Sequence, residues 1–390
     1  MKATRRIRAD RRPASAHGCS GGHAASGVPR HTARRLAGRI AVQCRRPACV
    51  RYLLAPLATS LVAIPAFALP QQDALRPAGI QALHIVRLWN LTLVVTGIVF
   101  AAVLAVLLVA LVRRPRAHET TPPDLRGVHH PERRTRRFVV GASGASVVLL
   151  AGLIVADVFT DGALSRLPIA DPLHIELTGQ QWWWQAVYPP DHGRPGFTVA
   201  NELHVPVGRP VVVSLKASDV IHSFWVPNLH GKKDMLPGID SRIEFRADET
   251  GTWRGQCAQF CGPEHALMAM LVTADTPSNY AAWAAHQATP AATPQVSDVD
   301  AARGMQVFLQ AGCANCHAVQ GSPAAGATAP DLTHLMSRTT LAAGVLANTP
   351  ANLAAWIRHP DSFKPATTMP TLPLSDADLH AVVSWLATLQ

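Results

Sequence analysis

Two long apolar segments limit what this chain can fold into. Residues 88–112 and 138–159 are 25 and 22 residues long, are dominated by Leu, Val and Ala, and contain a single charged side chain, Asp157. At about 1.5 Å per residue, a helix of either length crosses a hydrocarbon layer of about 30 Å. A buried helical hairpin in a soluble protein is the alternative. We expect a two-helix transmembrane hairpin over residues 80–160.

The segment between these runs predicts how the hairpin is oriented. Residues 113–137 contain eight arginines, three acidic residues and no lysine. Short loops rich in Arg and Lys stay on the cytoplasmic side of a membrane. Everything after about residue 160 is therefore expected on the outer, periplasmic side of a bacterial inner membrane, where disulfides are permitted.

A basic leader accounts for the net charge of the chain. Residues 1–68 carry 13 Lys and Arg against one acidic residue, which leaves 23 basic and 24 acidic residues in the remainder. Because this charge lies in a leader with little apolar content, we expect no nucleic-acid binding. The apolar run 53–70, with Ala66-Phe67-Ala68 near its end, resembles a secretory signal. A retained, proline-broken membrane helix is the alternative.

The exported part predicts two modules of different secondary structure. Residues 171–274 show short stretches of alternating polarity separated by Pro, Gly and Asp/Asn clusters, which is typical of an all-β sandwich or barrel. Residues 276–297 predict a short helix followed by a Pro/Ala linker. Residues 298–390 have helical patterns, so an all-α module is expected there.

The helical module contains the motif CANCH, from Cys313 to His317. In this motif the thiols of Cys313 and Cys316 would bind the vinyl groups of a covalent haem c, and His317 would ligate its iron. A redox disulfide or half of a zinc site are the alternatives. The second axial ligand of a high-potential haem would be a thioether. We favour Met369, in the loop KPATTMPTLP, over Met336, which lies in a helical pattern typical of a core residue.

A second cluster of metal-binding residue types is CAQFCGPEHALM, from Cys257 to Met268. Cys257 and Cys261 could form a disulfide, but His265 and Met268 follow closely, and DVIHSFWVP supplies His222. A thioether beside thiolates and imidazoles suits copper better than zinc. With a main-chain carbonyl these donors number six, too many for a closed tetrahedral zinc site and enough for two coppers that share both sulfurs. A disulfide and a Cys2His2 zinc site remain alternatives.

These motifs together resemble a known family. The segments DVIHSFWVP, CAQFCGPEHALM and GQQWWWQ resemble the membrane-anchored subunit II of haem–copper cytochrome c oxidases. The CANCH…TTMP module resembles the cytochrome c fused to that subunit in caa-type bacterial oxidases. The resemblance covers roughly residues 80–390. It implies a cupredoxin-like barrel with a dinuclear copper centre, CuA, over residues 162–275, and a class I cytochrome c domain over residues 298–390.

The resemblance also implies roles for individual residues. By position, Cys257 and Cys261 would bridge two coppers, His222 and His265 would each bind one, and Met268 and the main-chain carbonyl of Gln259 would complete the two ions. Trp182, the first residue of WWW, would be the point at which electrons enter. Gln259 replaces a glutamate that is commoner in the family and helps to hold magnesium there. Because neutral Gln is a poorer ligand for that cation, the resemblance leaves the magnesium site open.

The function implied is that of an electron-accepting subunit of a proton-pumping terminal oxidase. Electrons would arrive from cytochrome c or another donor, pass through haem c and CuA, and reach subunit I, with subunit III as a further partner. No helical cluster of histidines lies in either apolar run, so oxygen reduction is expected in subunit I. The alternatives are the copper subunit of a nitrogen-oxide reductase and an exported copper chaperone.

Overall fold

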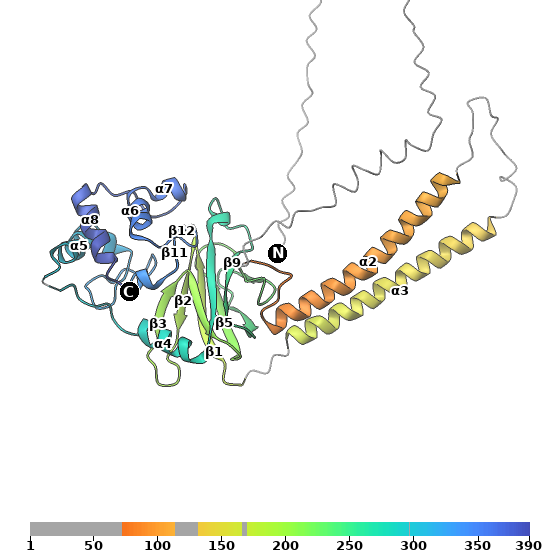
Figure 1. The fold of residues 1–390 in the computed structure, drawn as a ribbon, viewed down its shortest axis with the longest axis horizontal. Coiled ribbons are helices and arrows are strands. Elements are labelled where there is room, and N and C mark those ends of the chain that lie inside the picture. Colours follow the sequence, from red (N-terminus) through yellow and green to blue (C-terminus); the bar gives the residue numbers. More distant parts are fainter. Residues whose placement is uncertain (1–71, 114–131, 166–169, 296) are drawn as a thin grey trace, which may run out of the picture. The chain divides into compact units, whose positions relative to one another are not determined.

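The computed structural model describes residues 72–113, 132–165, 170–295 and 297–390. The predicted leader, its signal-like segment and most of the arginine-rich loop lie outside these ranges. Two long helices come first in the described chain, α2 (Ile80–Val112) and α3 (Arg133–Leu164), and they lie side by side (Figure 1). Both are long and apolar enough to cross a membrane, and protein covers neither apolar stretch.

Helix α2 extends further toward the N-terminus than the apolar run predicts, starting at Ile80 and not at residue 88. Its first turn belongs to a segment that packs on the following domain. Gln81 and Ala82 are buried, the Gln81 side-chain oxygen accepts a hydrogen bond from the Arg246 backbone at 3.3 Å, and the Ala82 N–H donates to the Leu229 carbonyl at 3.2 Å. These contacts replace the lipid-facing apolar pattern, so hydropathy alone starts the helix too late.

The second part is a domain of two five-stranded sheets, as the alternating sequence predicts. One sheet has the order β3-β2-β1-β5-β8 and the other β4-β10-β9-β6-β7. The bounds of the first sheet's strands are β1 (Leu173–Gln180), β2 (Trp183–Tyr188), β3 (Phe197–Ala200), β5 (Val211–Ala217) and β8 (Ser241–Phe245). Those of the second are β4 (Glu202–Pro206), β6 (His222–Trp225), β7 (Lys233–Met235), β9 (Gly251–Cys257) and β10 (Ala269–Asp275).

One apolar core joins the two sheets. Along β1 and β9 every second side chain is buried, which is the two-residue period of a strand with one face toward a core. Leu177 and Trp184 from the first sheet and Phe224 and Val272 from the second belong to the same buried cluster. The predicted cupredoxin-like all-β domain is therefore confirmed. Helix α4 (Pro277–Gln287) follows it, capped by the Thr276 side chain.

The last part is the helical module that the sequence predicts. Its helices are α5 (Val299–Gln310), α6 (Pro350–Arg358), α7 (Pro360–Phe363) and α8 (Asp376–Leu386), with short 3-10 turns at η2 (Cys313–Asn315) and η3 (Leu335–Ser337). A small hairpin of β11 (Thr340–Leu341) and β12 (Leu346–Ala347) interrupts the otherwise helical module.

Helices α5 and α8 cross at a glycine. A Cβ atom on Gly304 would lie 2.0 Å from the Ala381 carbonyl oxygen, so only glycine permits this approach. Beside it, the rings of Phe308 and Trp385 meet edge to face with centroids 5.0 Å apart. Gly304 and Phe308 near one end of the helical module and Trp385 near the other are the sequence pattern that favours such a crossing of terminal helices.

The substitution Gly304→Ala is expected to loosen the α5–α8 crossing, because the added methyl group overpacks a contact of backbone against backbone. Overpacking of this kind costs about 1–3 kcal/mol. Amide hydrogen exchange in α5 and α8 should accelerate by roughly tenfold or more, while the β-domain is unchanged. Gln306→Ala, on the exposed face of the same helix, is the matched control. Equal exchange in both variants would contradict this account of the crossing.

Candidate functional site

The loop between β9 and β10 carries most of the predicted metal donors. It begins at Cys257, the last residue of β9, and ends at Met268, directly before β10. The Cys257 N–H donates to the Met268 carbonyl at 2.9 Å, which closes the loop at its base. Within it, η1 (His265–Leu267) turns His265 back toward Cys261. The neighbouring strand β6 pairs with β9 and places His222 beside Cys257.

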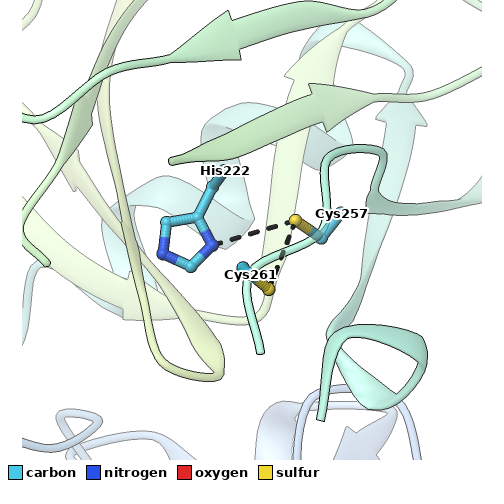
Figure 2. Close-up of side chains that lie close together, drawn as sticks. All are labelled: His222, Cys257 and Cys261. Atoms are coloured by element: carbon cyan, nitrogen blue, oxygen red, sulfur yellow. Dashed lines mark hydrogen bonds between the residues drawn. The ribbon is translucent and has the colours of Figure 1, made fainter. Parts of the chain in front are cut away.

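The predicted donors converge on the two cysteine sulfurs. The Sγ atoms of Cys257 and Cys261 are 3.7 Å apart, and His222 Nδ1 is 3.8 Å from the first of them (Figure 2). The remaining contacts run from Cys257 Sγ to the Gln259 carbonyl oxygen at 3.2 Å, from Cys261 Sγ to His265 Nδ1 at 3.6 Å and from Cys261 Sγ to Met268 Sδ at 3.9 Å. All six predicted donors are thus brought together.

The spacing of the sulfurs suits a shared metal better than a disulfide. A disulfide bond is about 2.05 Å long, and both thiols are free at 3.7 Å. A divalent metal lies about 2.3 Å from a thiolate, so one ion can contact both sulfurs and a second can do so from the opposite side. His222, Cys257 and Cys261 are buried and their donor atoms lie within 4.8 Å of one another. The donor set therefore fits a pair of ions with bridging sulfurs.

Asp219 sets the orientation of His222. Its Oδ1 lies 2.8 Å from His222 Nε2, so this ring nitrogen donates and Nδ1 is left as the ligand atom facing Cys257. Its Oδ2 accepts the backbone N–H of Gln181 at 2.7 Å. Burial acts to lower the pKa of His222, but Cys257 and Asp219 together outweigh it and the pKa is raised. The sequence analysis missed Asp219, although an acid three residues before a ligand histidine was a usable signal.

The two thiols are unequal before any metal binds. Hydrogen bonding from Cys261, helped by His222 and by the Gln259 and Ser223 backbone, lowers the pKa of the Cys257 thiol to about 3. The thiolate formed there raises the pKa of Cys261. The lowered pKa favours the thiolate of Cys257, which is the form of cysteine that binds metals.

Trp182 lies against the metal-binding loop. It sits between β1 and β2, and its indole Nε1 donates to the Cys261 carbonyl at 3.0 Å. The Gln181 side chain donates to the same oxygen at 2.8 Å. Gly262, with φ of +119°, permits this packing, since a Cβ atom there would lie 3.0 Å from the indole ring. Trp182 is therefore one hydrogen bond away from a predicted bridging cysteine.

The CANCH motif opens onto a cavity of about 450 Å³, within the range of cofactor sites. Cys313, Cys316, His317 and Met369 all line it, whereas Met336 does not. Met336 lies in the short turn η3 and is half-buried against the core of the helical module. Residues of the β-domain complete the wall of the cavity, among them the pair Trp182 and Trp183.

His317 is held in the form that an iron ligand requires. Its Nδ1 lies 2.7 Å from the Pro330 carbonyl oxygen, to which it donates, and so Nε2 is free to bind a metal. Burial lowers the pKa of His317, which keeps the ring neutral. The chemistry of these residues, with two thiols beside them, fits a covalent haem c. The sequence analysis did not identify Pro330, because a carbonyl partner leaves no residue-type signal.

Comparisons with known proteins match two segments of this chain to families. Residues 190–275 match the family described as "Cytochrome C oxidase subunit II, periplasmic domain", and residues 301–390 match the family "Cytochrome c". The chain is 34% identical over 325 residues to "Cytochrome c oxidase subunit 2" of Alkalihalophilus pseudofirmus, covering 81% of this chain and 90% of that protein. It is 35% identical over 231 residues to the protein of the same name from Bacillus subtilis, covering 56% of this chain and 63% of that protein.

Among solved structures, the chain is similar to the periplasmic domain of subunit II of cytochrome oxidase from Bradyrhizobium japonicum. The two are 32% identical, with a TM-score of 0.29, over 31% of this chain and 96% of that chain.

Met369→Leu is expected to remove the second axial ligand of a bound haem, because Met369 is the methionine at the cavity. The covalently attached haem should remain, while its optical spectrum changes from that of a His/Met low-spin haem to that of a five-coordinate or otherwise ligated haem. Met336→Leu is the matched control and should leave the spectrum unchanged. The reverse pattern would show that the ligand is Met336.

Proposed function

This chain belongs to the cytochrome c oxidase subunit 2 family, and from that premise we propose that it is the electron-accepting subunit of a proton-pumping terminal oxidase. It is a membrane-anchored oxidase subunit that combines a periplasmic copper-type domain with a cytochrome c domain. In the proposed role, the chain takes electrons from cytochrome c or another donor and delivers them to subunit I, where oxygen is reduced to water. Subunit III is a further expected partner.

One observation carries the copper part of the proposal. Six donors of the types that bind copper meet in one place, and two of them are the cysteine sulfurs, 3.7 Å apart. In this proposal Cys257 and Cys261 bridge two coppers, His222 and His265 bind one each, and Met268 and the Gln259 carbonyl complete the ions. Such a pair would supply a one-electron carrier whose geometry changes little on reduction. Asp219 orients His222, and burial of Cys257 and Cys261 shields their sulfurs from water.

The cavity beside CANCH carries the haem part. Cys313 and Cys316 would attach haem c, and His317 and Met369 would be its axial ligands. The bound haem would supply a second one-electron carrier. Pro330 fixes the His317 ring, and Trp182 and Trp183 line the same cavity from the side of the copper loop. Trp182 therefore lies between the two sites, which supports its role as the point at which electrons enter the copper domain.

Removing donors of the copper site should abolish a specific spectrum. The purified full-length chain is expected to bind two coppers and to show the multiline EPR signal of a mixed-valence pair. Cys257→Ser should lose that signal and at least half of the copper, because a hydroxyl is a poor substitute for a bridging thiolate. His192→Ala, which alters an exposed histidine of the same domain, should keep both. A colourless protein after subtraction of the haem spectrum would refute the copper assignment.

Trp182→Phe should slow electron delivery without loss of copper. The phenyl ring cannot donate to the Cys261 carbonyl, so the direct contact between the indole and the loop is lost. We expect copper reduction by a rapid donor to slow by roughly tenfold or more, with unchanged copper content. Trp183→Phe is the matched control, since Trp183 lines the cavity but donates no hydrogen bond to the loop among the described contacts. Equal slowing in both variants would contradict a specific role for Trp182.

A further inference from the structure

Lys364 is a buried lysine that the oxidase function does not explain. It is the only lysine of residues 276–390, and only 4% of it is exposed. Its Nζ donates to the carbonyl oxygen of Trp182 at 2.8 Å and to that of Leu267 at 3.0 Å. Lys364 belongs to the cytochrome module, whereas both acceptors belong to the copper domain. A side chain that is normally exposed is thus enclosed at the contact between two modules.

A second contact flanks the same part of the copper loop. The carbonyl that accepts from Lys364 is that of Leu267, directly before the predicted ligand Met268. Directly after this ligand, the Ala269 N–H donates to the Ala343 carbonyl of the cytochrome module at 3.0 Å. The turn that offers Ala343 has left-handed backbone from Ala342 to Gly344. The cytochrome module therefore binds the backbone on both sides of Met268.

Glu264 adds a third contact. Its Oε1 accepts the Ala366 N–H at 2.7 Å, two residues beyond Lys364. Its Oε2 is buried without a hydrogen-bond partner within the described part of the chain. Burial lowers the pKa of Lys364 to about 8, and the Glu264 carboxylate opposes that shift. The buried ammonium is thus compensated by two carbonyl dipoles and a nearby carboxylate, the arrangement that a buried charge requires.

We propose that Lys364 is a positioning residue that clamps the cytochrome module onto the copper-ligand loop and so holds Trp182 and Met268 in place. It acts through the backbone, because it donates to the carbonyls of Trp182 and Leu267. Its side chain also lines the cavity that Cys313 and Met369 line. The purpose of this clamp rests on the proposed function, whereas its geometry rests only on the hydrogen bonds of Lys364. The clamp would join the cytochrome module to the copper loop through hydrogen bonds as well as through the linker.

Lysine labelling of the wild-type full-length chain tests the clamp without any substitution. Lys216 and Lys232 have side chains 45% and 48% exposed and serve as internal references. With an amine-reactive probe and mass spectrometry, Lys364 should react at least tenfold more slowly than either reference. Labelling of Lys364 at the rate of the references would overturn the clamp. This readout does not depend on bound copper or haem, so it stands even where the proposed function fails.

The substitution Lys364→Met tests whether the clamp holds the copper loop and speeds electron transfer. Methionine keeps the length and apolar part of the side chain but donates nothing to the two carbonyls. The amides of Ala269 and Ala366 should exchange at least tenfold faster, and electron transfer from photoreduced haem to copper should slow by roughly tenfold. Haem and copper content should stay as in the wild type. Lys216→Met, an exposed lysine on β5, is the matched control and should change none of these.

The outcomes separate the two proposals. Faster exchange and slower transfer at unchanged cofactor content support the clamp. Unchanged exchange and transfer in Lys364→Met overturn it and leave the oxidase function intact. Absence of copper or haem from the wild-type chain would instead refute the proposed function, while the labelling of Lys364 would still decide whether the modules are clamped.

Discussion

The hydrogen bond from the Cys257 N–H to the Met268 carbonyl is the constraint on which the site depends. It joins the ends of a loop that carries five of the six donors, and it continues the β9–β10 pairing directly below the sulfurs. Because the sheet fixes both ends of the loop, its donors are held close to one another and beside His222. Backbone pairing thus offsets part of the entropy cost of ordering these side chains when the protein folds.

Each metal donor that the sequence predicts belongs to a short local motif. Cys257, Cys261, His265 and Met268 lie within twelve residues, and the distant His222 is marked by the segment DVIHSFWVP. The structure brings all of them together with the Gln259 carbonyl. Local spacing was enough to predict this cluster of side chains, because the ends of the loop are hydrogen-bonded to each other and its side chains can extend in few other directions.

The fold is predicted best where one periodic signal dominates. The alternating polarity of β1 and β9 indicates strands, and the small residue Gly304 indicates a close crossing of α5 and α8. Prediction fails where contacts between distant segments take over. Helix α2 starts at Ile80 because its first turn packs on the β-domain, and the partners Pro330 and Lys364 act through contacts that no local pattern encodes. Backbone carbonyls, in particular, accept hydrogen bonds from any residue type.

Trp182 shows how the two modules depend on each other. Its indole donates to Cys261 in the copper loop, while its own carbonyl accepts from Lys364 of the cytochrome module. The peptide N–H before it is held by Asp219, which also orients His222. Trp182 is therefore hydrogen-bonded both to the copper loop and to the cytochrome module. A shift of the cytochrome module would be transmitted to the copper loop through backbone atoms. Under the proposed function, the hydrogen bonds that hold Trp182 against the loop and the cytochrome module would keep the electron path between the two sites constant.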